Sequence, residues 1–153
     1  MLRHHPQTSL KPAAIGLELT PQASSVRPPQ RILIIEDELL VALMIEEMCR
    51  GAGYRVSGVA HTFQMAQDEL AKRNFDAVLL DISVVARCHP KTANYLRAKD
   101  IPFAFVTGYD YLIDPRHEKV PVLQKPFTPV QLRALLETLV GPGSLRGKSA
   151  RAA

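Results

Sequence analysis

Five polar side chains in this sequence lie where apolar runs end, and their types would suit the binding of a phosphoryl group. They are Glu36, Asp37, Asp81, Thr107 and Lys125. Carboxylate oxygens are ligands that suit Mg²⁺, and a divalent cation, a lysine and a hydroxyl can together neutralise phosphoryl charge. The carboxylate of Asp81 could then act as a nucleophile and form an aspartyl phosphate.

Each of these residues also has an ordinary structural interpretation. An Asp after an apolar strand commonly caps a helix or lies in a loop, and Glu36 with Asp37 could cap the helix that follows. A single Lys-Pro step usually carries no function. The functional interpretation depends on all five occurring together, at the ends of four expected strands. Carboxylates crowded into one crevice raise one another's pKa unless a cation lies among them.

The elements expected to position these side chains alternate between strand and helix. Short apolar runs indicate strands at 31–35, 54–60, 75–81, 103–107 and 120–124. Apolar spacing and capping residues indicate helices at about 38–51, 63–73, 90–99 and 129–140. The face of the first helix expected to pack against the sheet carries Leu40, Leu43, Met44 and Met48.

This alternation favours an α/β protein whose parallel sheet is covered on both faces by helices. Right-handed crossovers leave doubly wound topologies, and strand order 2-1-3-4-5 places the first and third strands side by side. That order would bring Glu36, Asp37 and Asp81 into one crevice. Residues 82–89 are expected to form an irregular loop, and residues 109–119 at most a short helix. No glycine-rich phosphate loop follows the first strand.

The 153 residues suffice for one domain with a real core, expected at 31–140. Residues 1–30 are rich in proline and predict a flexible tail, and residues 141–153 predict a short basic tail. The net charge of +4 comprises +2 and +3 in the tails and −1 in the domain. Neither a secretory signal nor a membrane span is recognisable, and two cysteines indicate no disulfide framework. A cytoplasmic protein is therefore expected.

The chain resembles the receiver domain of bacterial response regulators over residues 31–140. Four motifs carry the resemblance: Ile34-Ile35-Glu36-Asp37-Glu38, Leu79-Leu80-Asp81, Phe105-Val106-Thr107-Gly108 and Gln124-Lys125-Pro126-Phe127. The resemblance implies a (βα)5 flavodoxin-like fold, a three-layer sandwich. It also implies a Mg²⁺-dependent switch that takes a phosphoryl group from a sensor histidine kinase or a histidine phosphotransferase.

Matched by position, Asp81 resembles the phosphoacceptor of that family. Glu36 and Asp37 resemble its acidic metal-binding pair. The main-chain carbonyl of Ser83 is implied as a further metal ligand.

The remaining matches concern the two strands that follow. Thr107 resembles the hydroxyl that moves onto the phosphoryl oxygen, and Lys125 resembles the cation that pairs with it. The resemblance also implies a cis bond between Lys125 and Pro126. The run from Phe105 to Tyr109 is similar to a subgroup called the FAT GUY receivers, which are mostly stand-alone.

The chain departs from the receiver pattern at two places. Most receivers have an aromatic switch residue three positions before the lysine, where this sequence has Val122, and Tyr109 or Tyr111 would have to replace it. The loop after Asp81 is more apolar than in most receivers, so Val84 and Val85 are either buried or part of a docking patch. These departures bear on the rate and lifetime of phosphorylation.

The leading hypothesis is a stand-alone response regulator that is a switch, and not a turnover enzyme, signalling through a downstream protein. Only thirteen residues follow from Gly141 onward, so no output domain is expected. The alternative is an unphosphorylated pseudo-receiver that acts as a protein-binding module. A Mg²⁺-dependent phosphohydrolase would place an acid at position 83, which is Ser83. Nucleic-acid binding would have to rely on the basic tails, and the sequence leaves a homodimer open.

Overall fold

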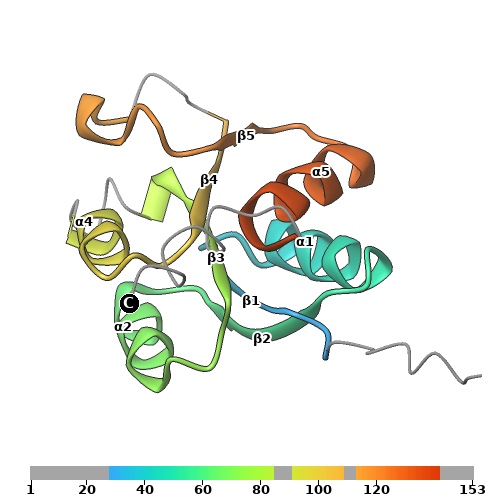
Figure 1. The fold of residues 1–153 in the computed structure, drawn as a ribbon, viewed down its shortest axis with the longest axis horizontal. Coiled ribbons are helices and arrows are strands. Elements are labelled where there is room, and N and C mark those ends of the chain that lie inside the picture. Colours follow the sequence, from blue (N-terminus) through green and yellow to red (C-terminus); the bar gives the residue numbers. More distant parts are fainter. Residues whose placement is uncertain (1–27, 85–90, 109–112, 142–153) are drawn as a thin grey trace, which may run out of the picture.

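Five short apolar runs form one parallel sheet in the computed structural model, which describes residues 28–84, 91–108 and 113–141 (Figure 1). The strands are β1 (Arg31–Ile35), β2 (Arg55–Ala60), β3 (Ala77–Asp81), β4 (Phe103–Thr107) and β5 (Val122–Gln124). Their order is β2-β1-β3-β4-β5, with every pair parallel. The doubly wound, flavodoxin-like architecture predicted from the sequence is confirmed.

Helices cover both faces of this sheet, as Figure 1 shows. They are α1 (Leu39–Gly51), α2 (Phe63–Lys72), α4 (Lys91–Ala98) and α5 (Pro129–Val140). One core lies between the sheet and α1 with α5, and a second lies between the sheet and α2 with α4. Within β1, Ile32 and Ile34 pack in the first core, while Leu33 and Ile35 pack in the second. This strand is apolar throughout because successive side chains point to opposite, equally buried faces.

Two strands begin two residues later than the sequence predicts. The carboxylate of Asp76 accepts a hydrogen bond from the main-chain N–H of Arg31 at 2.9 Å and pairs with its side chain, so pairing of β3 starts at Ala77. Before β5, the N–H of Val120 donates to the His117 carbonyl, and Pro121 has no N–H to donate. A contact with the neighbouring strand thus precedes β3, and a turn precedes β5.

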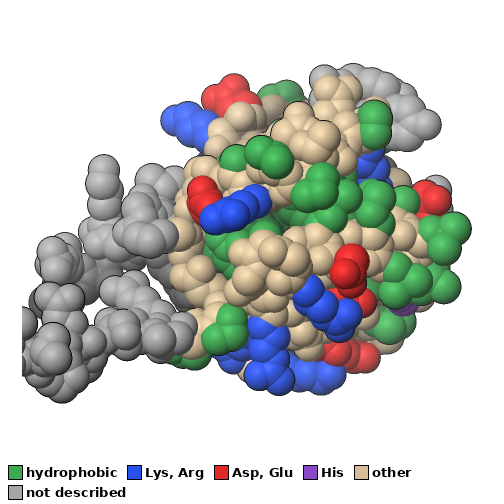
Figure 2. Space-filling model, turned by 90° about the vertical axis from the view of Figure 1, so that its right-hand side faces the viewer, with side chains coloured by type: hydrophobic (Ala, Val, Ile, Leu, Met, Phe, Trp, Pro, Cys, Tyr) green, Lys and Arg blue, Asp and Glu red, His purple; other side chains and the backbone are tan. Residues whose placement is uncertain are grey.

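The face of α1 that packs on the sheet differs from the predicted one. Ala42, Ile45 and Cys49 are buried, and Met48 packs against the core as predicted. In contrast, an exposed α1 face consists of Leu39, Leu40, Leu43 and Met44, which are 58%, 74%, 51% and 41% exposed. The first two turns of α1 are apolar nearly all round, so spacing cannot select the buried side. Figure 2 views the molecule from the side of α1 and α5, where hydrophobic side chains gather.

The connections after β3 and β4 follow the prediction only in part. Residues 82–84 are helical instead of irregular, and Ile82 and Val84 are buried in the second core. Val85 lies outside the described residues. Between β4 and β5, the described part holds a single 3₁₀ turn, η2 (Pro115–His117), which agrees with the short helix expected there.

None of the helices in the described ranges is long and apolar enough to cross a membrane.

Candidate functional site

The polar residues that end the strands meet at one edge of the sheet because parallel strands present their carboxyl ends together. Ile35 of β1 is paired with Leu80 of β3 and with Ala60 of β2, so the residues that follow become neighbours. They border a crevice of about 450 Å³. It is lined by Glu36, Asp37, Glu38, Asp81, Ser83, Gly108 and Lys125. Ligands of doubly wound proteins bind at this position, where the strand order reverses.

Three carboxylates converge in the crevice as the sequence predicts. One oxygen from each of Glu36, Asp37 and Asp81 lies within 4.8 Å of the other two. Glu36 is 1% exposed and Asp81 is 5% exposed, so water screens their repulsion poorly. A set of oxygen donors with room for water fits Mg²⁺, which keeps several waters and binds through one or two carboxylates. These residues would hold the ion, although their role as ligands stays a prediction.

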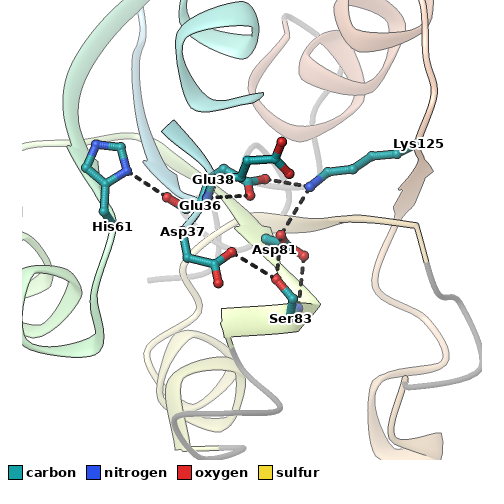
Figure 3. A network of polar contacts seen from close by, with 7 residues as sticks. All are labelled: Glu36, Asp37, Glu38, His61, Asp81, Ser83 and Lys125. Atoms are coloured by element: carbon teal, nitrogen blue, oxygen red, sulfur yellow. Dashed lines mark hydrogen bonds and ion pairs between the residues drawn. The ribbon is translucent and has the colours of Figure 1, made fainter. Parts of the chain in front are cut away.

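Lys125 supplies a positive charge to this cluster (Figure 3). Its Nζ lies 2.6 Å from Glu36 Oε2 and 3.1 Å from Asp81 Oδ2. The main-chain N–H of Lys125 donates to the Thr107 carbonyl at 2.8 Å, which fixes it to the end of β4. The peptide bond from Lys125 to Pro126 is cis, as the resemblance implies. Two residues after Pro126, Thr128 caps α5.

Burial and charge separate the pKa values of the two most buried carboxyl groups. Burial raises the pKa of Glu36 to about 7, against the lowering effect of its hydrogen bond with Lys125. Burial also opposes ionisation of Asp81, but hydrogen bonds from Ser83 and the Lys125 charge outweigh it, so the pKa of Asp81 is lowered. Burial disfavours the Lys125 cation, yet its bonds to the two carboxylates raise the pKa of Lys125. Asp81 is thus held as the carboxylate anion that a nucleophile requires.

Ser83 contributes its side chain and main-chain N–H to the site, where sequence reasoning expected only its carbonyl. Its N–H donates to Asp81 Oδ1 at 2.9 Å, and its Oγ lies 2.7 Å from Asp81 Oδ2 and 3.1 Å from Asp37 Oδ1. The metal-binding role of the carbonyl stays a prediction. The helical turn at 82–84, which the sequence did not indicate, directs the Ser83 side chain into the crevice.

Two supporting contacts were not anticipated from the sequence. The Nδ1–H of His61 donates to the Glu36 carbonyl at 2.9 Å, and the Glu38 N–H donates to Glu36 Oε1 at 3.2 Å. His61 directly follows Ala60, which pairs with Ile35, so the register of β1 and β2 sets it beside Glu36 (Figure 3). Strand pairing was the signal that could have revealed this contact.

Thr107 and Gly108 occupy the end of β4. Thr107 is 1% exposed and does not line the crevice, so a hydroxyl contact with a phosphoryl group would require a movement. Gly108 lines the crevice, and a Cβ built there would meet nothing within 4 Å. Val122, which stands where most receivers have an aromatic switch residue, is 40% exposed. Tyr109 and Tyr111 lie outside the described residues.

A flavodoxin-like sheet with a carboxylate cluster and a lysine at its switch point defines a class of proteins that could bind a cation and a phosphoryl group. No family model matches the chain. Among solved structures, SdrG from Sphingomonas melonis Fr1 is 35% identical with a TM-score of 0.65, over 74% of this chain and 98% of that one. The PhyR response regulator receiver domain of Erythrobacter litoralis is 30% identical with a TM-score of 0.62, over 71% and 88% of the two chains.

A curated protein is also similar to this chain in sequence. The phyllosphere-induced regulator PhyR of Methylorubrum extorquens is 32% identical over 110 residues, which are 69% of this chain and 41% of that protein. The chain thus spans less than half of this relative. It belongs to the family of response regulator receiver domains, as the likeness to SdrG and to the Erythrobacter domain shows.

Proposed function

We propose that this protein accepts a phosphoryl group on Asp81 from a sensor histidine kinase or a histidine phosphotransferase, in a Mg²⁺-dependent reaction. The observation that supports this most directly is the setting of Asp81. Its carboxylate lies in an open crevice, 3.1 Å from the Lys125 ammonium and within 4.8 Å of two further carboxylates. An ionised nucleophile, a cation site and a lysine are together the groups that phosphoryl transfer requires.

In the proposed step, the phosphoryl group moves from a nitrogen of the donor to an oxygen of Asp81. A carboxylate oxygen of Asp81 attacks the phosphorus of a phosphohistidine, so an O–P bond forms while the N–P bond breaks. The electron pair of the N–P bond stays on the imidazole nitrogen of the donor, which takes up a proton from water. Lys125 stabilises charge at the acceptor, and Mg²⁺ bound by Glu36, Asp37 and Asp81 would supply charge neutralisation.

Phosphorylation would act as a switch because it replaces the single negative charge of the Asp81 carboxylate with close to two negative charges on phosphoryl oxygens, in an already acidic crevice. Lys125 now pairs with Glu36 and Asp81, and the phosphoryl oxygens would compete for it. The buried Thr107 hydroxyl would move toward the same oxygens. Both residues lie at the ends of β4 and β5, so the surface near these strands would change and could be recognised by a partner protein.

Phosphotransfer to the wild-type protein and to Asp81→Asn tests the proposal. With acetyl phosphate and Mg²⁺, we expect an acid-stable, base-labile phosphate on the wild type and none on Asp81→Asn. Asp68→Asn is the matched control, because Asp68 is exposed on α2, away from the crevice, and this variant should be labelled like the wild type. Absence of label on the wild type, or equal label on Asp81→Asn, would refute phosphoacceptance and favour the pseudo-receiver.

A protein donor would have to cover the rim of the crevice, and the exposed α1 face begins there. Glu38 lines the crevice, and the helix with exposed Leu39 and Leu40 starts at the next residue. We expect Leu40→Glu to slow labelling by a phosphorylated kinase or phosphotransferase but not by acetyl phosphate. Equal labelling of the wild type and Leu40→Glu by a cognate protein donor would exclude α1 from the docking surface.

We also propose that the protein is a switch and not a turnover enzyme. Position 83 holds a serine hydroxyl hydrogen-bonded to Asp81, where a phosphohydrolase would need a general acid. Steady release of phosphate from small esters would contradict this. Action without a fused output domain, and a cytoplasmic location, stay predictions.

A further inference from the structure

Ser83 spans two of the three carboxylates in the crevice. Its Oγ is 2.7 Å from Asp81 Oδ2 and 3.1 Å from Asp37 Oδ1, and its N–H donates to Asp81 Oδ1. Figure 3 shows the Ser83 side chain directed at Asp37 and Asp81. Asp37 and Asp81 are 44 residues apart, and this one hydroxyl contacts both of them.

The hydroxyl has a single proton to donate, and both of its neighbours are acceptors. The Ser83 hydroxyl can donate its proton to one carboxylate, or share it between the two, and it carries no positive charge. Hydrogen bonds to ionised acceptors are among the stronger ones. The contact therefore stabilises a close approach of Asp37 and Asp81 that would otherwise depend on a cation.

We propose that Ser83 is a positioning residue whose hydroxyl holds Asp37 and Asp81 in the cation-free protein and thereby lowers the affinity of the crevice for a divalent cation. Asp81 Oδ2 accepts from both Ser83 and Lys125, so an entering cation must compete with those donors for the same oxygens. This inference rests on the cation-binding part of the proposed function. It adds a residue that sets the concentration of Mg²⁺ at which phosphorylation begins.

The direction of the effect follows from linkage. A cation that binds Asp81 Oδ2 and Asp37 Oδ1 displaces the hydroxyl from these same oxygens, so the free energy of the displaced contacts subtracts from the affinity. Removing the hydroxyl takes away this stabilisation, so the repulsion between the two carboxylates favours binding of a cation more strongly. We expect Ser83→Ala to bind Mg²⁺ about tenfold more tightly, the change that corresponds to one charged hydrogen bond of ordinary strength.

The test is titration of the intact protein with Mg²⁺ by calorimetry, without any phosphodonor. Ser83→Thr keeps a hydroxyl and should bind like the wild type. Ser57→Ala is the matched control, because its hydroxyl contacts the Ile32 carbonyl at 3.3 Å, away from the crevice. With acetyl phosphate, the Mg²⁺ concentration that gives half-maximal labelling should fall for Ser83→Ala by the same factor as the dissociation constant.

Each outcome decides the matter. Tighter binding by Ser83→Ala together with unchanged binding by Ser83→Thr and Ser57→Ala supports the inference. Unchanged or weaker binding by Ser83→Ala overturns it, and weaker binding would make the hydroxyl a ligand. Tighter binding by Ser83→Thr also overturns it, since a hydroxyl is then present without the effect. If the wild type and every variant fail to take up Mg²⁺ at millimolar concentration, the cation-binding part of the proposed function fails as well.

Discussion

Lys125 is the residue on which the electrostatics of the crevice depend. Its side chain is 22% exposed, and its ammonium faces Glu36 and Asp81, whose side chains are 1% and 6% exposed. Without it, two buried acids and Asp37 would lie together with no positive side chain lining the described crevice. A buried charge that loses its partner is costly, although protonation limits that cost.

We predict that Lys125→Met destabilises the cation-free protein by about 3 kcal/mol at pH 8. The loss should be smaller at pH 5, because Glu36, with a pKa raised to about 7, is then mostly neutral. Urea unfolding at the two pH values measures both quantities. Arg133→Met removes one positive charge from an exposed pair with Glu137 and should cost less than about 0.5 kcal/mol. Equal losses for the two variants would contradict this account.

Among the helices, α1 illustrates how packing selects one face of an apolar segment. Ile45 is 1% exposed and packs in the core, while its neighbour on the opposite side, Leu43, is 51% exposed. The two side chains have equal size and lie two residues apart in the same helix. Their contributions to stability should therefore differ through burial alone.

Substitution of each residue by alanine measures that difference. We predict a loss of about 3 kcal/mol for Ile45→Ala, which leaves a cavity, and less than about 1 kcal/mol for Leu43→Ala. Thermal or urea unfolding provides the comparison. A larger loss for Leu43→Ala than for Ile45→Ala would favour the helix face predicted from the sequence as the buried one.

The turn η2 before β5 buries a histidine in an apolar setting. His117 is 3% exposed and packs edge-on against Phe103 and Phe105, with ring centroids 6.4 and 6.0 Å away. Neither ring nitrogen has a hydrogen-bond partner among the residues that the structure describes. Burial lowers the pKa of His117; Asp114 opposes this, and Arg97 and Arg116 add to it.

This histidine should make the protein less stable in mild acid. The unfolded imidazole takes up a proton near pH 6.5, and the buried one only at lower pH, so the unfolded state binds more protons in between. The contribution of His117 to stability is complete above pH 6.5, falls as the pH drops below it, and levels off below the folded pKa. His117→Phe should lose less stability than the wild type between pH 8 and pH 5 in urea unfolding. Identical pH profiles would mean that the buried ring is protonated without cost.

The protein as a unit couples its stability to the crevice, because the carboxylates come from β1 and β3 at the centre of the sheet. Both strands are buried on both faces, and each pairs with two neighbours. Ligands that bind only the folded crevice therefore stabilise the entire sheet.

We predict that Mg²⁺ at a hundred times its dissociation constant raises the free energy of unfolding by about 2.7 kcal/mol. Asp37→Asn should lose most of this increase, while Asp68→Asn, an exposed change of the same kind, should keep it. Sodium chloride at matched ionic strength controls for general screening. An equal increase with sodium chloride would show that no specific site is involved.

The sequence was sufficient for the strand order and for the convergence of Glu36, Asp37, Asp81 and Lys125. Apolar runs of strand length, each ending in a polar residue, leave few alternatives once parallel pairing and right-handed crossovers apply. These are local patterns joined by general rules of topology, so they can be recognised without coordinates.

The three-dimensional structure was needed to identify buried faces and hydrogen-bond partners wherever the sequence pattern is compatible with several of them. The buried face of α1 was predicted wrongly because its first turns are apolar on every side, and only packing distances distinguish Ile45 from Leu43. The contacts of Ser83 and His61 depend on a helical turn and a strand register, each of which fixes the position of a side chain closely enough to decide its hydrogen bonds. Hydrogen bonds require that precision, whereas hydrophobic periodicity fixes only which side of an element is covered.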